Sequence, residues 1–387
     1  MARGGNDKLK ELLEKKIPVY SYSKLTTFEQ CKYNYYKGYV LKEKSKDNIY
    51  SIIGSVIHDG IEKVYTEDRD IKETEKEFLQ CIKEASDKGI VFPENPPTTK
   101  INYIKNMTHF FNNYKKLDTK MITEQFILLS IPRFKDAVND EDYIWMQMYI
   151  DSIYPIYDEL DGKKKLASVI VNDWKTSSKF DKEKLKKASK QLLLYKIGVE
   201  QSTGVPVSKI GWTMLKYVYC CSYGAKGQIK KSALVERKDS VKYFYKSIVK
   251  DLIKNGMDTM EAELLVGKCV SNNSFEFLPK EIQNKYWIED CFLEFEFNDD
   301  IVEETKRWVI DVVNKIESLG KVESNYPPIE ICQKTAYFCN VLCGRPNCKY
   351  LIKYNNDNRD NFKKEKKEEE INNKMGKAKI DLDSLFI

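Results

Sequence analysis

The sequence predicts an α/β fold in which a mixed central β-sheet is flanked by helices. Apolar β-branched runs typical of buried strands lie in the middle of the chain, above all VIV at 169–171. Amphipathic patterns typical of helices precede and follow these strands. Hydrophobic residues make up 42% of the 387 residues, which is enough to fill a sizeable core. This order of helices, strands and helices indicates an α/β domain with a mixed sheet.

Helical patterns occupy the first third of the chain. Residues 6–16 predict a short charged helix within an amino-terminal extension, 1–19. Ser23 is the expected N-cap of a second helix, which continues through LTTFEQCKYNYYKGYV. The segment IIGSVIHDGIEKVY predicts a third helix, and the periodicity over about 66–125 indicates a helical insertion.

The middle of the chain has the character of strands. YIWMQMYIDSIYPI, from residue 143, and LASVIVNDWKT flank a turn-rich segment and predict a β-hairpin whose second strand is buried on both faces. The helix KLKKASKQLLLYKIGVE follows, and KIGWTMLKYVY with IKKSALVERK predicts a second hairpin. Further helices are expected near 239–255 and 299–319.

The end of the chain has little to bury. Residues 351–387 predict a disordered tail that ends in the apolar peptide IDLDSLFI, 380–387. The amino terminus lacks an apolar signal region, and no run of about 18 apolar residues occurs. We therefore expect a cytoplasmic protein without a membrane segment. The net charge is +6, and nearly all the basic residues are Lys, with very few Arg. Any contact with nucleic acid should therefore be largely sequence-neutral.

Two aspartates fall on the two strands of the first predicted hairpin. Asp151 lies in the first strand, and Asp173 lies two residues before Lys175 at the end of the second. Carboxylates on paired strands lie close together, and both stay ionised only if a cation lies between them. Mg²⁺ or Mn²⁺ is the expected cation, with the carbonyl oxygen of Trp174 as a further ligand. Lys175 would neutralise charge that develops on a phosphate. By itself, an Asp-x-Lys pattern is more often a surface salt bridge.

Five motifs, taken in order, resemble the PD-(D/E)XK nuclease superfamily, in its RecB-like and AddB-like branch that carries an iron–sulfur cluster and includes CRISPR-associated exonucleases. These motifs are SYSKLTTFEQCKYNYY, GSVIH, MYIDSI, NDWKTSS and QLLLY. The resemblance spans about residues 20–350 and implies a restriction-endonuclease-like nuclease core. One departure is Met148, which stands where a Gly often precedes the family's aspartate by three residues.

The resemblance implies a role for each matching residue. The implied metal ligands are His58, Asp151 and Asp173. Lys175 would be the catalytic lysine, and Gln191 and Tyr195 would line the site on the DNA side. Without the motif order, His58 would be read as a packed helical histidine, which remains the interpretation of His109. Glu62, one turn after His58, is expected to be a solvated charge.

The cysteines divide into two groups. Cys339, Cys343 and Cys348 lie within ten residues, around a Gly-Arg-Pro turn, with spacing suited to zinc or an iron–sulfur cluster. The resemblance implies a 4Fe–4S cluster with Cys31 as its fourth ligand, although the usual Cys-x2-Cys-x5-Cys spacing is Cys-x3-Cys-x4-Cys here. A zinc site that uses Cys332 in place of Cys31 is the alternative. The remaining cysteines are expected to be buried thiols: Cys81, Cys220, Cys221, Cys269 and Cys291.

The function implied is a Mg²⁺- or Mn²⁺-dependent deoxyribonuclease that acts on single-stranded DNA or duplex ends. An exonuclease in repair, recombination or replication, of bacterial or phage origin, fits the resemblance. Residues 380–387 resemble peptides that dock on replication proteins. The alternatives are a non-catalytic DNA-binding or scaffold protein of the same fold and, from the cysteines alone, a zinc-bearing interaction protein.

Overall fold

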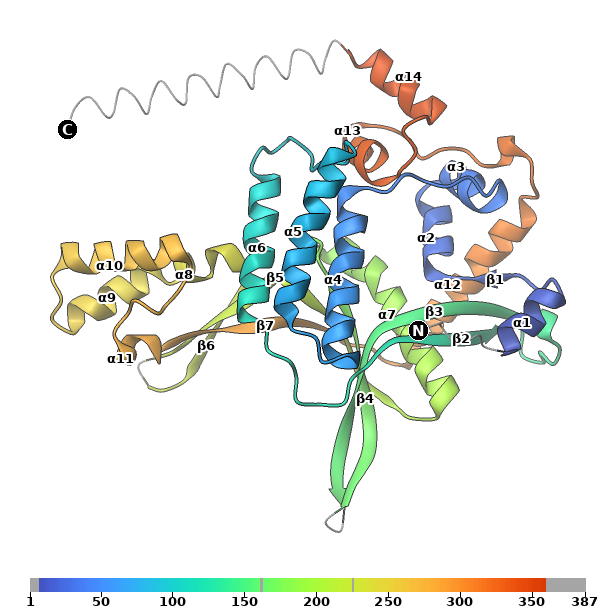
Figure 1. The fold of residues 1–387 in the computed structure, drawn as a ribbon. Helices are drawn as coiled ribbons and strands as arrows, with labels where there is room; N and C mark the ends of the chain where they lie inside the picture. Colours follow the sequence, from blue (N-terminus) through green and yellow to red (C-terminus); the bar gives the residue numbers. More distant parts are fainter. Residues whose placement is uncertain (1–6, 161–162, 225, 360–387) are drawn as a thin grey trace. The chain divides into compact units, whose positions relative to one another are not determined.

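The computed structural model describes residues 7–160, 163–224 and 226–359 (Figure 1). The chain divides into two compact units. The first consists of residues up to Leu25 together with Ile49–Ser318, and the second consists of Thr26–Asn48 together with the residues from Leu319 onward. The predicted terminal peptide, 380–387, lies outside the described residues.

The first unit is built on a seven-stranded mixed sheet. The strands run in the order β1-β3-β4-β5-β6, while β2 pairs with β3 and β7 pairs with β5. Their bounds are β1 Val19–Tyr20, β2 Ile122–Pro132, β3 Tyr143–Leu160, β4 Lys163–Lys175, β5 Val207–Tyr223, β6 Ile229–Glu236 and β7 Tyr286–Phe295. The β1–β3 and β4–β5 pairs are parallel and the others are antiparallel, so the predicted mixed sheet is confirmed.

Helices flank this sheet. In the first unit they are α1 Asp7–Glu14, α4 Ile49–Thr66, α5 Ile71–Asp87, α6 Thr99–Asn113, α7 Lys182–Thr203, α8 Ser240–Tyr243, α9 Tyr245–Lys254, α10 Thr259–Asn272, α11 Lys280–Gln283 and α12 Asp299–Ser318. Figure 1 shows α4, α5 and α6 side by side. Their apolar faces share one core cluster with Trp174 of β4 and Leu215 of β5, which fixes α4 against the strands that carry the predicted site.

The helix α7 crosses from β4 to β5 and packs closely on the sheet. Gly198 permits this approach, because a Cβ atom there would lie 2.7 Å from the Cε atom of Met148 and 2.9 Å from Ile127. The amino end of α7 is capped by Asp181, whose carboxylate accepts a hydrogen bond from the main-chain N–H of Lys184. Close packing therefore sets the position of the α7 side chains relative to β3.

The end of the predicted helical insertion is wrong, because strand β2 begins there. Its first residues, Ile122 to Gln125, fall in the range that we predicted to be helical, since α6 ends at Asn113 and the sheet resumes at Ile122. Ile127, Leu129 and Ile131 are buried at alternate positions. This alternation outweighs the helical pattern of the preceding segment.

Strand β7 and helices α10 and α11 were not predicted. Together with α8, α9 and the far part of β5 they bury a second cluster around Val218, Phe244, Ile248 and Val266. The buried residues of α10, Ala262, Val266 and Cys269, recur at helical spacing, so the sequence carried a helical signal there that we did not use.

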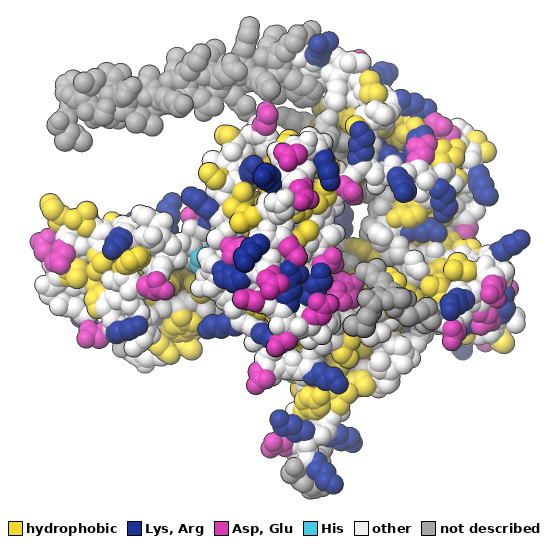
Figure 2. Space-filling model, in the orientation of Figure 1, with side chains coloured by type: hydrophobic (Ala, Val, Ile, Leu, Met, Phe, Trp, Pro, Cys, Tyr) yellow, Lys and Arg dark blue, Asp and Glu magenta, His cyan; other side chains and the backbone are white. Residues whose placement is uncertain are grey.

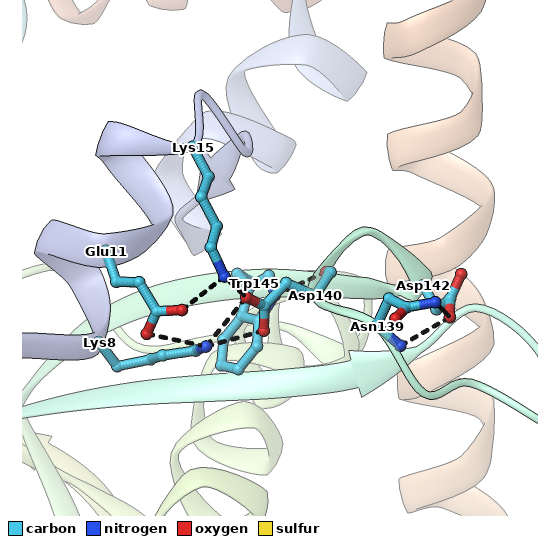
Figure 3. A network of polar contacts seen from close by, with 7 residues as sticks. All are labelled: Lys8, Glu11, Lys15, Asn139, Asp140, Asp142 and Trp145. Atoms are coloured by element: carbon cyan, nitrogen blue, oxygen red, sulfur yellow. Dashed lines mark hydrogen bonds and ion pairs between the residues drawn. The ribbon is translucent and has the colours of Figure 1, made fainter.

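The predicted amino-terminal helix is present as α1, and a polar network holds it in place (Figure 3). The Nζ atoms of Lys8 and Lys15 both lie 2.8 Å from carboxylate oxygens of Asp140, and both also pair with Glu11. The indole N–H of Trp145 in β3 donates to the main-chain oxygen of Asp140. The network thus ties α1 to the connection between β2 and β3.

The second unit contains the region around Cys31. The helix α2, Tyr22–Gln30, begins before the predicted N-cap, and the hydroxyl of Ser21 rather than Ser23 accepts a main-chain N–H, that of Lys24. The expected continuous helix is broken at Cys31, which is extended and caps the next helix through its sulfur. The remaining elements of this unit are α3 Lys32–Tyr35, the π-helical turns Tyr36–Val40 and Phe338–Leu342, the 3₁₀ turn Glu323–Asn325, α13 Gln333–Tyr337 and α14 Lys349–Asp357.

The helix α14 also extends past residue 351, where the predicted tail begins. Leu351 is buried, which explains why this segment is ordered as a helix.

On the face drawn in Figure 2, Lys and Arg side chains are interspersed with Asp and Glu side chains over α5 and α6. Across the described residues, no helix combines the length and apolar character needed to cross a membrane.

Candidate active site and cysteine cluster

The two predicted aspartates lie side by side at the base of the β3–β4 hairpin. Ser152 of β3 pairs with Asn172 of β4, so Asp151 lies next to Asp173. Both are almost completely buried, with exposed fractions of 8% and 2%. Two buried carboxylates on neighbouring strands require positive charge nearby to remain ionised.

Asp151 is held by two donors. The Nδ1 atom of His58, from α4, lies 3.4 Å from its Oδ2 atom, and the main-chain N–H of Trp174 donates to the same oxygen over 2.8 Å. The indole ring of Trp174 packs edge-on against the His58 ring, with centroids 5.9 Å apart. The structure therefore brings His58 on α4 to the aspartate pair, as the order of motifs led us to expect.

Asp173 is paired with Lys175. The Nζ atom of Lys175 lies 2.5 Å from the Oδ2 atom of Asp173, so the two side chains share one face of β4. That ion pair lacks hydrogen-bond geometry, and among the described residues Asp173 Oδ2 has no hydrogen-bond partner. A buried carboxylate oxygen left in this state has the position and chemistry of a metal ligand.

Burial and charge act in opposite directions on these groups. Burial raises the pKa of Asp173, and the neighbouring charge of Asp151 adds to the rise, although Lys175 opposes it. Burial alone would raise the pKa of Asp151, but the hydrogen bond and the charge of His58 bring it below the ordinary value. The pKa of His58 is raised because the two carboxylates outweigh its burial. A divalent cation at this position would favour the ionised form of both carboxylates.

Glu124 of β2 is a further acidic group that sequence reasoning missed. One ligand atom each of His58, Glu124 and Asp151 lie within 4.8 Å of one another, a spacing suited to a metal ion. Glu124 lies opposite Asp151, between the pairs Thr123–Ser152 and Gln125–Ile150, and its φ is +48°. A left-handed backbone at a non-glycine residue within a strand is strained, and such strain is common at functional sites. Glu62 does not belong to this group.

A buried polar scaffold stiffens the strands behind the aspartates. The side-chain amide of Asn172 donates to Ser152 Oγ over 2.9 Å, and the hydroxyl of Thr213 in β5 donates to Asn172 Oδ1 over 2.8 Å. These bonds connect β3, β4 and β5 at the level of the site. They fix the backbone on which Asp151 and Asp173 stand.

Gln191 and Tyr195 lie on α7 beside the carboxylates. The amide of Gln191 donates to the hydroxyl oxygen of Tyr195 over 2.8 Å. Burial raises the pKa of Tyr195, and the charges of Asp173 and Asp151 raise it further. The structure thus pairs Gln191 with Tyr195 on α7. It brings His58 to Asp151 and Lys175 to Asp173, and Trp174 contributes its N–H to Asp151.

Four cysteines line one cavity in the second unit. Cys31, Cys339, Cys343 and Cys348 surround it together with apolar residues that include Ile329 and Leu351. The sulfur of Cys31 accepts main-chain N–H groups from Asn34 at 3.4 Å and Ile329 at 3.5 Å. Burial raises the pKa of Cys343 to about 12, and the nearby Cys31, Cys339 and Cys348 contribute to the rise.

Cys332 is placed differently. It does not line the cavity, and its sulfur takes part in the cap of α13, where the hydroxyl of Thr335 approaches it at 3.7 Å. The other cysteines, which we expected to be buried thiols, are all buried and unbonded to one another: Cys81, Cys220, Cys221, Cys269 and Cys291.

The loop that carries the three carboxy-terminal cysteines is bound to the Cys31 segment. The guanidinium of Arg345 donates to Asn34 Oδ1 over 2.9 Å and to the main-chain oxygens of Glu43 and Lys44. The main-chain N–H of Lys46 donates to Gly344 O over 2.8 Å. These contacts bring cysteines from the two ends of the chain to one place.

Comparison with known proteins identifies one family. The family model of the PD-(D/E)XK nuclease superfamily matches residues 19–270. This range contains His58, Glu124, Asp151, Asp173 and Lys175 together with Gln191 and Tyr195. No curated protein sequence matches the chain.

Proposed function

Because the chain belongs to the PD-(D/E)XK nuclease superfamily, we propose that it is a deoxyribonuclease that hydrolyses phosphodiester bonds with Mg²⁺ or Mn²⁺. The observation that carries the proposal is the buried carboxylate centre of Asp151 and Asp173. It has His58 and Glu124 at ligand distance from Asp151, and an Asp173 oxygen without a hydrogen-bond partner among the described residues. Oxygen-rich sites of this kind suit hard divalent cations.

Each residue has a proposed role. Asp151, Asp173 and His58, with Glu124, hold the metal ion, and the carbonyl oxygen of Trp174 is a further candidate ligand. When bound, the metal supplies a polarised phosphate and an activated water. Lys175 holds its ammonium 2.5 Å from Asp173, where it can donate to a phosphate oxygen as negative charge develops. Gln191 and Tyr195 contact the DNA.

The mode of action that we propose is exonucleolytic, in DNA repair, recombination or replication. On the face drawn in Figure 2, Lys and Arg side chains lie among Asp and Glu side chains, so this face is not a continuous basic surface. The substrate would be contacted with little sequence preference.

Digestion of end-labelled DNA tests the function. Single-stranded and duplex DNA are incubated with Mg²⁺ or Mn²⁺ and the wild type, Asp173→Ala or Lys175→Ala. Lys164→Ala is the matched control, because this lysine is exposed on the outer part of the hairpin. We expect the wild type and the control to release short products from ends and the two site variants to be inactive. Equal activity in all four proteins would refute the assignment, and DNA binding without cleavage by the wild type would support a non-catalytic role.

We further propose that Cys31, Cys339, Cys343 and Cys348 hold a 4Fe–4S cluster. Four thiols at one apolar cavity, with main-chain N–H groups directed at the Cys31 sulfur, suit such a cluster. Its role would be to staple the two segments of the second unit.

Anaerobic purification tests the cluster. A brown protein that contains iron is expected, and Cys31→Ser should lose the colour while Cys332→Ser keeps it. A colourless protein that contains zinc would support the alternative, as would loss of the metal in Cys332→Ser but not in Cys31→Ser.

A further inference from the structure

The helices α9 and α10 carry a surface that has no part in the roles assigned so far. They form a helical hairpin in the first unit, and one face of it packs on the core cluster around Val218 and Phe244. The other face borders a groove of about 400 Å³. The groove is lined by Tyr245, Lys246, Val249, Lys250 and Ile253 of α9 and by Glu263 of α10.

The side of the groove that α9 forms is apolar along its length. Tyr245, Val249 and Ile253 follow one another at intervals of four residues, so they make one stripe along the helix. Tyr245 and Val249 are half-buried against the core cluster, and Ile253 is 40% exposed. A stripe of this kind can receive apolar side chains from another helix.

The helix α10 presents apolar side chains that match such a groove. Met260 and Leu264 are each 70% exposed, and with Gly267 they lie on the face of α10 that points away from its buried residues. A Cβ atom at Gly267 would have no neighbour within 4 Å, so the space in front of this face is open. Hydrophobic side chains are visible in Figure 2 on the surface of the lobe that contains α9 and α10. The hairpin thus exposes both a groove and the side chains that would fill one.

The charges beside the groove are also complementary to one another. Lys246 and Lys250 lie on α9, and Glu263 lies on α10. Among the described residues, the only ion pair made by these two helices joins Asp251 to Lys285. Basic and acidic groups on the same surface, each without an ion-pair partner, are complementary to a second copy of that surface.

We propose that α9 and α10 form the interface of a symmetric dimer, in which the hairpin of one chain packs on the same hairpin of a second copy. A two-fold axis brings identical surfaces together, so each groove faces the apolar side chains of the other chain. Met260 and Leu264 of one chain enter the groove of the other. Lys250 of one chain pairs with Glu263 of the other. The surface itself supplies both the groove and its complement, which favours a second copy over an unrelated partner. The proposal does not depend on the nuclease function.

The oligomeric state of the full-length chain tests this interface. The wild type is studied by analytical ultracentrifugation over about a hundredfold range of concentration, because the population of a dimer depends on concentration. We expect a dimer for the wild type and a monomer for Leu264→Glu, which places a charge in the interface and leaves the buried face of α10 unchanged. Leu79→Glu is the matched control, since this leucine of α5 is 45% exposed, and it should remain dimeric. A dimeric Leu264→Glu protein would overturn the proposal. A monomeric wild type would also overturn it and would point to a different protein as the occupant of the groove.

An exchange of charges tests the pairing across the two-fold axis. Lys250→Glu and Glu263→Lys should each raise the dissociation constant of the dimer about tenfold, because like charges then face each other. When the two variants are mixed, each contact again contains one Glu and one Lys, so a mixed dimer should form with about the affinity of the wild type. Lys105→Glu, at an exposed position of α6, is the matched control and should leave the dissociation constant unchanged. Far-ultraviolet circular dichroism confirms that each variant is folded. Single variants that dimerise like the wild type, or a mixture that does not recover the affinity, would overturn the assignment.

Discussion

At the scale of single residues, Asp173 shows how the site departs from what stability alone would favour. Its carboxylate is 2% exposed, and its Oδ2 atom has an ion pair with Lys175 but no hydrogen bond among the described residues. Burial of an ionised group without full compensation costs free energy. A function that needs the charge of this carboxylate would account for an acid at such a costly position.

Asp173→Asn tests this interpretation. The neutral amide removes the charge that burial penalises, so the melting temperature of the metal-free protein should stay the same or rise. DNA cleavage should fall at least about a hundredfold, because the amide is a poor ligand for a divalent ion. Asp158→Asn, at an exposed position of the same hairpin, should change neither quantity. Thermal melting and initial cleavage rates measure the two effects, and an active Asp173→Asn protein would contradict the account.

His109 provides a pH test away from the metal centre. Burial, aided by the charge of Arg237, lowers the pKa of His109 from 6.5 to about 4. Between these values the unfolded chain binds a proton that the folded chain does not, so stability is lost as pH falls from about 6.5 to about 4. His109→Gln should reduce this loss by up to about 3 kcal/mol. Urea unfolding at several pH values measures it, and parallel curves for both proteins would contradict the assignment.

At the scale of elements, β2 determines which acids meet. Glu124 reaches the His58–Asp151 pair because β2 pairs with β3 in one particular register, and a shift by one residue would turn its side chain to the other face. The positive φ at Glu124 is the local distortion that accompanies this placement.

Glu124→Gln should therefore weaken metal binding and leave the fold intact. We expect the Mn²⁺ concentration for half-maximal cleavage to rise about tenfold, because one charged ligand is lost while three remain. Gln125→Ala, at the exposed neighbouring position, is the matched control and should leave the metal dependence unchanged. Identical metal titrations for Glu124→Gln and the wild type would show that Glu124 does not bind the ion.

Some elements could be predicted from the sequence and others could not. The β3–β4 hairpin could be predicted because a buried VIV run and alternating polarity follow from the pleat of a strand. Glu124 could not, because its role depends on the pairing of β2, although the alternation of Ile127, Leu129 and Ile131 would have revealed the strand itself. The break at Cys31 escaped prediction because tertiary contacts, such as the bond from Ile329 N–H to its sulfur, override a helical pattern.

In the second unit, a substitution at Gly344 tests the close contact between the cysteine loop and the segment around Lys46. Its φ is +67°, and a Cβ atom there would lie 2.4 Å from the main-chain oxygen of Lys46. Gly344→Ala should lower the free energy of unfolding by more than about 1 kcal/mol and reduce the iron content. Gly320→Ala is the matched control, since it has a similar φ of +63° but no atom within 4 Å of its Cβ position, so it should cost less. Equal effects on melting temperature and iron content would contradict the predicted clash.

At the scale of the whole molecule, two kinds of site occupy separate compact units. The proposed metal ligands and Lys175 lie on the mixed sheet and on α4 in the first unit. The four cysteines of the second unit come from two segments, Thr26–Asn48 and the residues from Leu319 onward, that are far apart in the sequence. The free energy of cluster binding would offset the entropy lost on joining such distant segments. Hydrolysis and structural stapling are thus assigned to different groups of residues.

The measurement that tests the central claim most directly is a titration of cleavage with Mn²⁺. Protein freed of divalent ions with chelator is mixed with labelled single-stranded DNA, and the single-turnover rate is recorded as Mn²⁺ is added to the wild type and to Asp151→Asn. The account predicts no cleavage without metal, a saturable rate in the wild type, and little or no rate in Asp151→Asn at any Mn²⁺ concentration. Cleavage by the metal-free wild type, or the same titration curve for both proteins, would contradict it.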